Sequence, residues 1–208
     1  MAYRDNREYR NFSIGKVERR EEGENPSFLV EGYATNFEEY VLFEENGIQY
    51  KERILPEAFD ENTDMSDVIF VKDHTGTVFA RTKNGTLTLE VTDNGLLTRA
   101  DLSKTSASRQ AFEEIETGMY SQMSFAFVVD DDEYNTTEHL RTIRHISKLY
   151  DTSFVSFPAN PTTSISVATR SRFDGFIEQE KAERLAREEE IRLARAKYEY
   201  VKEQNHGN

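Results

Sequence analysis

Three Asn-Gly dipeptides, at positions 46–47, 84–85 and 94–95, constrain the fold more than any other feature of the sequence. Asn-Gly is the strongest short signal for a β-hairpin, because both turn residues tolerate a positive φ. The dipeptides separate apolar runs of strand length, for example YVLF from GIQYKERI and TLTLEV from LLTRADL. The middle of the chain is therefore predicted to be a meander of short, mostly antiparallel strands.

Further strands and one helix are predicted around this meander. The additional strand segments are FSIGKVE (12–18), PSFLVEGYATNF (26–37), DVIFVKDH (67–74), MSFAFVV (123–129), LRTIRHISKLY (140–150), TSFVSF (152–157) and SISVATR (164–170). A helix is predicted over 106–117, because Ala111, Phe112 and Ile115 form one apolar stripe and Gly118 is placed to end it. The acidic segment 130–138 is predicted to be an exposed turn.

The C-terminal part of the chain differs in composition from the rest. From Phe173 to about Gln204 the sequence predicts a long charged helix whose apolar positions do not sustain a heptad. A solvated helix with i,i+4 charge pairs is one interpretation, and a helix that docks on a partner is the other. The predicted organisation is thus a polar N-terminal segment (1–25), one main domain (26–170) and a helical tail (171–208), in the α+β class.

Charge and composition exclude several classes of function. The chain carries 26 Lys and Arg against 39 Asp and Glu, a net charge of −13 that repels phosphate backbones, so we expect no nucleic-acid partner. The absence of cysteine excludes disulfides, thiolate zinc sites and cysteine nucleophiles. No apolar run approaches the roughly 18 residues of a membrane span, so we expect a cytosolic protein without membrane contact. Nucleophilic chemistry must use an oxygen or an amine.

The segment GMYSQMSFAFVV (118–129) contains the best candidate for a nucleophile. It places Ser124 where a helix has ended and a strand begins, with Ser124 and Ala126 on one face and bulkier side chains on the other. The structural alternative is that Ser124 only begins a half-buried strand. Ser121 competes for the same role, but the strand register puts it in the preceding turn.

A serine hydroxyl needs a base, and the base gains from a carboxylate that holds its other ring nitrogen in the right tautomer. His74 ends an apolar strand and is free to reach a neighbour, while Asp151 lies at the junction of two predicted strands. The alternative for His74 is an ordinary surface histidine, and the alternative for Asp151 is a residue of a turn or bulge. His139 and His145 lack the spacing and the third ligand of a metal site.

The order of these segments resembles the tailed-bacteriophage prohead serine protease family over about 32–170. The most specific pieces are a Ser-Phe-x-Phe motif at Ser124 and a leucine, carboxylate and serine before Pro-Ala-Asn-Pro in LYDTSFVSFPANP. The family's loop histidine and serine match His74 and Ser124, and its carboxylate matches Asp151. The loop departs from the pattern, since Asp73 precedes the histidine and no acidic residue follows it.

The resemblance implies a fold similar to herpesvirus assembly proteases, with a β-barrel-like core, surrounding helices and the protease domain at 26–170. It implies a serine endopeptidase without metal or organic cofactor, acting inside the assembling prohead in the host cytoplasm. Its partners would be the major capsid protein and scaffold segments, with a homodimer as a further expectation. The sequence does not show the oxyanion hole; the segment 153–157 is a candidate.

The same resemblance suggests a function for the helical tail. We expect it to dock on the scaffold or the coat protein, and to be removable by self-cleavage. Two alternative functions stay open on the sequence. One is a non-catalytic scaffolding protein on the same fold, and the other is a general bacterial peptidase from an integrated phage remnant.

Overall fold

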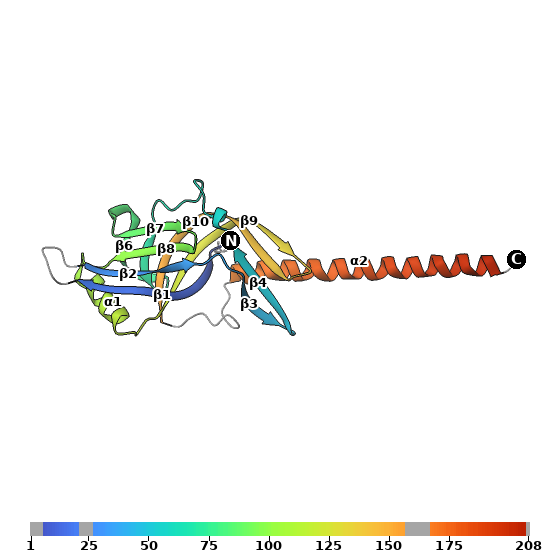
Figure 1. Ribbon diagram of the computed structural model, residues 1–208, viewed down its shortest axis with the longest axis horizontal. Helices are drawn as coiled ribbons and strands as arrows, with labels where there is room; N and C mark the ends of the chain where they lie inside the picture. Colours follow the sequence, from blue (N-terminus) through green and yellow to red (C-terminus); the bar gives the residue numbers. More distant parts are fainter. Residues whose placement is uncertain (1–5, 21–26, 157–166, 207–208) are drawn as a thin grey trace, which may run out of the picture. The chain divides into compact units, whose positions relative to one another are not determined.

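The computed structural model describes residues 6–20, 27–156 and 167–206. Ten strands and two α-helices make up these ranges (Figure 1). The strands are β1 (Glu8–Arg20), β2 (Ser27–Thr35), β3 (Tyr40–Glu45), β4 (Ile48–Ile54), β5 (Ile69–Lys72), β6 (Thr75–Arg81), β7 (Leu87–Thr92), β8 (Gly95–Asp101), β9 (Gln122–Asn135) and β10 (Leu140–Val155). The helices are α1 (Ser106–Glu116) and α2 (Val167–His206), with short 3-10 turns at Pro56–Ala58 and Thr82–Asn84.

All ten strands belong to one sheet. Eight of them follow the order β3-β4-β10-β9-β1-β2-β8-β7; β5 pairs with β10, and β6 pairs with β5. Seven strand pairings are antiparallel and two, β10 with β4 and β10 with β5, are parallel. The α+β class and the mostly antiparallel pairing are confirmed. Over the described residues the sheet is not closed, so the barrel-like, herpesvirus-protease-like core remains a prediction.

Strands β9 and β10 are longer than predicted. The expected exposed turn at 130–138 is wrong for most of its length, because β9 continues to Asn135 and the turn covers only 136–139. Acidic side chains there pair across the hairpin: Asp132 contacts the Arg141 guanidinium at 2.6 Å. The two strands predicted at 140–157 are one strand, β10, whose register with β9 shifts between Leu149 and Asp151.

The N-terminal strand also exceeds its prediction, because β1 covers Glu8–Arg20 and lies between β9 and β2. Its Glu8 and Arg10 side chains enter a buried ion network with Glu52 of β4, Arg141 of β10 and Asp132 of β9. The Arg141 guanidinium binds the Glu8 carboxylate at 2.7 and 2.8 Å, and Arg10 binds Glu52 at 2.6 Å. None of these side chains is more than 6% exposed, so the network anchors β1 to the middle of the sheet.

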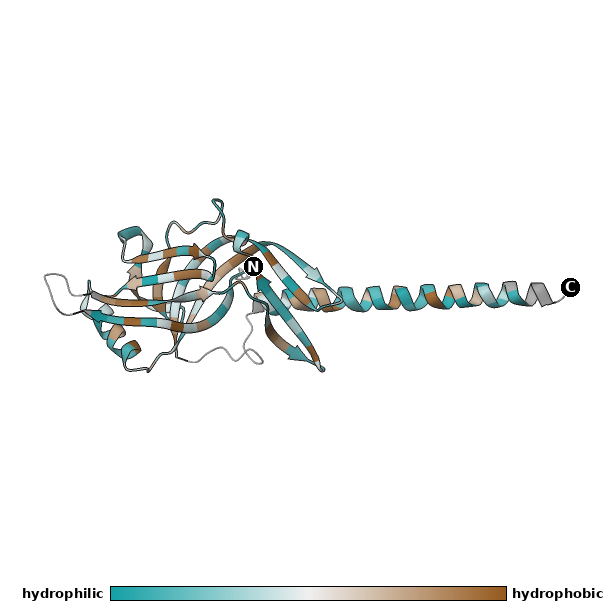
Figure 2. Cartoon of the chain, viewed as in Figure 1, coloured by the Kyte–Doolittle hydropathy of each residue, from teal (hydrophilic) through white to brown (hydrophobic). Residues whose placement is uncertain are grey.

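Helix α1 forms where the sequence predicts it. The Thr105 side chain accepts a hydrogen bond from the Ser108 amide as an N-cap, and Gly118, with φ of 79°, follows its C-terminal end. The apolar stripe of α1 is buried, and Phe112 meets Phe28 of β2 edge to face at 5.3 Å. Figure 2 shows the alternation of apolar and polar residues along the strands that pack around this core.

The chain divides into two compact units, Met1–Ala168 and Thr169–Asn208. The predicted long charged C-terminal helix is confirmed as α2, which begins earlier than expected. The predicted strand at 164–170 is wrong from Val167 onward, because these residues are helical; 164–166 lie outside the described residues. The sequence after Val167 is rich in Ala, Arg, Glu and Lys, which favour helix over strand.

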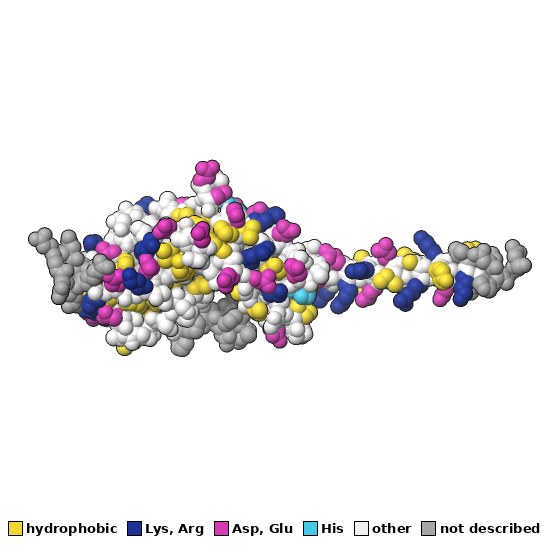
Figure 3. All heavy atoms as spheres, viewed as in Figure 1, with side chains coloured by type: hydrophobic (Ala, Val, Ile, Leu, Met, Phe, Trp, Pro, Cys, Tyr) yellow, Lys and Arg dark blue, Asp and Glu magenta, His cyan; other side chains and the backbone are white. Residues whose placement is uncertain are grey.

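The surface carries both signs of charge, interspersed over the face visible in Figure 3. No helix in the described part of the chain is long and apolar enough to span a membrane.

Candidate active site

Ser124 is the third residue of β9, and its strand neighbours determine what surrounds it. In the sheet it pairs with Ser153 of β10 on one side and with Asn11 of β1 on the other. Directly paired residues share a face of the sheet, as do residues two apart on a strand. Ser124, Ser153 and Asp151 therefore lie on the same face, while Phe125 and Phe127 point into the core, as the alternation predicts.

His74 lies in the turn between β5 and β6. Lys72 and Thr75 pair across the hairpin, which leaves Asp73 and His74 as its two turn residues, both with positive φ, 49° and 57°. Two positive φ values are what a two-residue type I′ hairpin requires, a turn usually made by Asn-Gly. Because β5 runs parallel to β10 beside Asp151, this turn delivers the imidazole to the face that carries Ser124.

The three predicted residues meet in one chain of hydrogen bonds. His74 Nε2 lies 2.8 Å from Ser124 Oγ, and His74 Nδ1 lies 2.6 Å from Asp151 Oδ1. Since an ionised carboxylate can only accept, Nδ1 carries the proton that points to Asp151 and Nε2 is left to accept from the serine. A serine protease needs the same order of groups: a serine hydroxyl, an imidazole and a carboxylate.

The three hydrogen-bonded residues differ in how far solvent reaches them. Ser124 and Asp151 are 0% and 4% exposed, whereas the His74 side chain retains 19%. Ala126, the small residue next to Ser124 on the same face, pairs with Asp151 on one side and with Tyr9 on the other. The Tyr9 ring meets the imidazole of His74 edge to face, with 4.5 Å between ring centroids.

Tyr9 was missed altogether in the sequence analysis, and Ser153 was considered there only as part of the oxyanion-hole segment 153–157. Ser153 Oγ lies 2.7 Å from Asp151 Oδ1 and 3.2 Å from the backbone nitrogen of His74. The sequence signal for these contacts of Ser153 is its place two residues after Asp151, on the same face of a strand. Tyr9 gave no signal, because its contact with His74 depends on the pairing of β1 with β9, more than a hundred residues later in the chain.

The other sequence candidates lie elsewhere. Ser121 is exposed and lies directly before β9, outside the strand as the register predicts. Of the segment proposed for the oxyanion hole, 153–155 belong to β10 and Phe157 lies outside the described residues. His145 pairs with Asp130 at 2.5 Å, and the described residues contain no group of three His, Asp or Glu side chains that could hold a metal ion.

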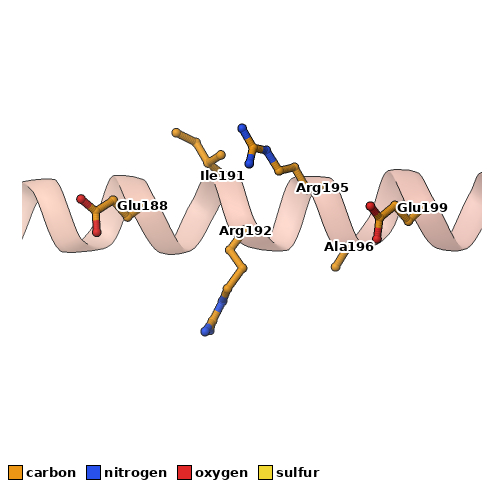
Figure 4. Close-up of a pocket in the computed structure, with 6 residues that line it drawn as sticks. All are labelled: Glu188, Ile191, Arg192, Arg195, Ala196 and Glu199. Carbon is orange, nitrogen blue, oxygen red and sulfur yellow. The ribbon is translucent and has the colours of Figure 1, made fainter.

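A surface hollow on α2 offers no second site. Its lining residues all belong to one helix: Glu188, Ile191, Arg192, Arg195, Ala196 and Glu199. Figure 4 shows Ile191 and Arg195 on one side of the helix and Arg192 and Ala196 on the opposite side. Side chains that diverge from a single helix do not enclose a ligand.

Comparison with known proteins places the chain in a family. The family model of the caudovirus prohead serine proteases matches residues 15–175, a range that contains Ser124, His74 and Asp151. The chain belongs to this family. It is therefore a serine protease, of the kind that acts in capsid maturation within the prohead, and the resemblance seen in the sequence is confirmed. The non-catalytic alternative loses its support.

Two further comparisons add little. Among solved structures, the bacteriophage T4 capsid assembly protease matches with a TM-score of 0.49 and 12% identity, covering 73% of this chain and 98% of that chain. The comparison with curated proteins gives no significant match.

Proposed function

We propose that Ser124, His74 and Asp151 are the catalytic triad of this prohead protease, with Ser124 as nucleophile, His74 as general base and Asp151 as the carboxylate that orients the base. The observation that carries this proposal is the continuous hydrogen-bond chain from Ser124 Oγ through both imidazole nitrogens to Asp151 Oδ1. Each pairing joins residues 50 or more positions apart in sequence, which local structure alone would not bring together.

The geometry supports the following reaction. His74 Nε2 takes the Ser124 proton as Ser124 Oγ attacks the scissile carbonyl, and the imidazolium that forms is stabilised by Asp151. The same proton passes to the leaving amine when the peptide bond breaks, which leaves an acyl group on Ser124. A water molecule, deprotonated by His74, then attacks the acyl carbonyl. The proton passes from His74 to Ser124 Oγ as the ester bond breaks and the acid leaves.

The substrates we propose are segments of the major capsid protein and of the scaffold, cleaved inside the assembling prohead in the host cytoplasm. Family membership supports a capsid-maturation role, and the substrates follow from it as an inference. We propose that α2 is the part of the chain that docks on these partners, because its exposed side chains combine Arg and Glu with apolar residues such as Leu185 and Leu193. We also propose that this tail, at 171–208, is removed by self-cleavage.

Co-expression with the coat protein tests the proposal. Mass spectrometry of the coat protein is expected to show a truncated product with the unaltered protease, and only the full-length mass with Ser124→Ala or His74→Ala. Ser121→Ala is the matched control, since it removes a nearby exposed hydroxyl and should leave processing unchanged. Processing that continues in Ser124→Ala would overturn the triad.

The intact mass of the protease in the same particles tests self-cleavage. We expect a chain shortened by the loss of residues 171–208 after maturation. A full-length active chain in mature particles would refute removal of the tail.

A further inference from the structure

The turn that carries His74 has a backbone conformation that residues other than glycine adopt infrequently. Asp73 and His74 both have positive φ, although the second residue of such a turn is usually glycine. Side chains with a Cβ are strained in this region, and such strain persists only where surrounding contacts hold it. The position of the base therefore depends on whatever holds the turn.

The end of β10 and the residue after it supply those contacts. The Asp73 amide donates to the Phe154 carbonyl at 3.1 Å, and the His74 amide donates to Ser153 Oγ at 3.2 Å. The Asp73 carboxylate accepts two hydrogen bonds from Ser156, 2.8 Å from the amide and 2.7 Å from the hydroxyl. Both turn residues are thus tied to the strand that also carries Asp151.

The Ser153 hydroxyl has three neighbours at this point: the Asp151 carboxylate, the His74 amide and, at 3.2 Å, His74 Nδ1. Its hydroxyl proton points to Asp151 Oδ1 at 2.7 Å, because an ionised carboxylate offers no proton in return. A lone pair of the same oxygen remains for the His74 amide. Ser153 is fully buried, so water has no access to replace the hydroxyl if it is removed.

We propose that Ser153 and Asp73 are positioning residues of this protease: Ser153 fixes the His74 backbone and the Asp151 carboxylate with one hydroxyl, and Asp73 clamps the turn to Ser156. This inference rests on the proposed triad. It assigns to β10 the task of holding the base as well as supplying the carboxylate.

The test measures the rate at which a fluorophosphonate probe labels the full-length protease in particles co-assembled with coat protein. Saturation kinetics give the maximal inactivation rate and the probe's half-saturation concentration separately. Ser153→Ala is expected to lower the maximal rate about ten- to hundredfold, the cost of a small misplacement of a catalytic group, with the half-saturation concentration unchanged.

Thr152→Val is the matched control. Thr152 is the neighbouring residue on β10, equally buried, and its hydroxyl has no hydrogen-bond partner. Its removal is expected to leave the inactivation rate unchanged. Equal rates for Ser153→Ala and Thr152→Val would overturn the role of Ser153.

Asp73→Gly tests the turn without depending on the folding of the Ser153 variant. Glycine relieves the backbone strain of the positive φ, so the fold should be no less stable. It also removes the carboxylate that binds Ser156, so the maximal inactivation rate should fall about tenfold. An unchanged rate would show that Asp73 serves only the local conformation and would overturn its positioning role. Failure of the triad itself gives a different pattern, in which Ser124→Ala and His74→Ala are labelled like the unaltered protein.

Discussion

Glu8 offers the sharpest test of how β1 is held in the sheet. Burial raises the pKa of Glu8, but hydrogen bonds from Arg141 and the charges of Arg10 and Arg141 outweigh it and lower the pKa from 4.5 to about 2. A shift of this size corresponds to about 3 kcal/mol of folding stability at neutral pH. Breaking a buried ion pair by removing one partner costs a similar amount, about 3–5 kcal/mol.

The sign of the pH dependence follows from the lowered pKa. The stabilisation is present above the unfolded value near 4.5 and is lost as the pH falls toward 2. Glu8→Gln is therefore expected to lower the unfolding temperature at pH 7 by about 6–12 °C, at about 2–4 °C per kcal/mol for a chain of this size. The difference between variant and unaltered protein should shrink as the pH falls from 5 to 2.

Calorimetric unfolding of both proteins at several pH values provides the assay. Glu57→Gln is the control, since Glu57 is exposed on a 3-10 turn and should leave the unfolding temperature unchanged at every pH. The same unfolding temperature for Glu8→Gln and the unaltered protein from pH 2 to 7 would refute the account of the network.

Three further predictions concern the site and the core. Asp151→Asn should preserve the fold but lower the labelling rate of Ser124 by orders of magnitude, because an amide cannot hold the required imidazole tautomer; equal labelling would contradict this. Gly95→Ala should prevent stable folding, as seen by circular dichroism, because its Cβ would lie 1.9 Å from the Thr35 carbonyl oxygen. Phe112→Ala should lower the free energy of unfolding in urea by about 3–5 kcal/mol, since Phe112 is fully buried; a loss below 1 kcal/mol would contradict its core role.

Local pattern was enough to predict much of the fold. The hairpin at Asn46-Gly47 forms as expected, with positive φ at both residues, and α1 ends before Gly118 as its sequence indicates. Prediction from local pattern failed where pairing with a distant strand decides the secondary structure. The acidic residues at 130–135 read as a turn, yet they extend β9 because arginines of β10 lie opposite them.

The candidate site divides in the same way. Ser124, His74 and Asp151 could be selected because their residue types and strand-end positions are typical of the chemistry, and the structure brings them within hydrogen-bonding distance. Ser153 was considered only within the oxyanion-hole segment and Tyr9 not at all, because a serine in a strand and a tyrosine near the N-terminus have no local signature for these contacts. Their importance depends on strand register, which a single sequence does not specify.

The claim that Ser124 is the nucleophile and His74 its base is tested most directly by mapping the fluorophosphonate adduct. Full-length protease co-assembled with coat protein is labelled, digested and sequenced by mass spectrometry. We predict a single adduct on Ser124 that is lost in His74→Ala and retained in Ser121→Ala. An adduct on another serine, or labelling of Ser124 that does not depend on His74, would contradict the account.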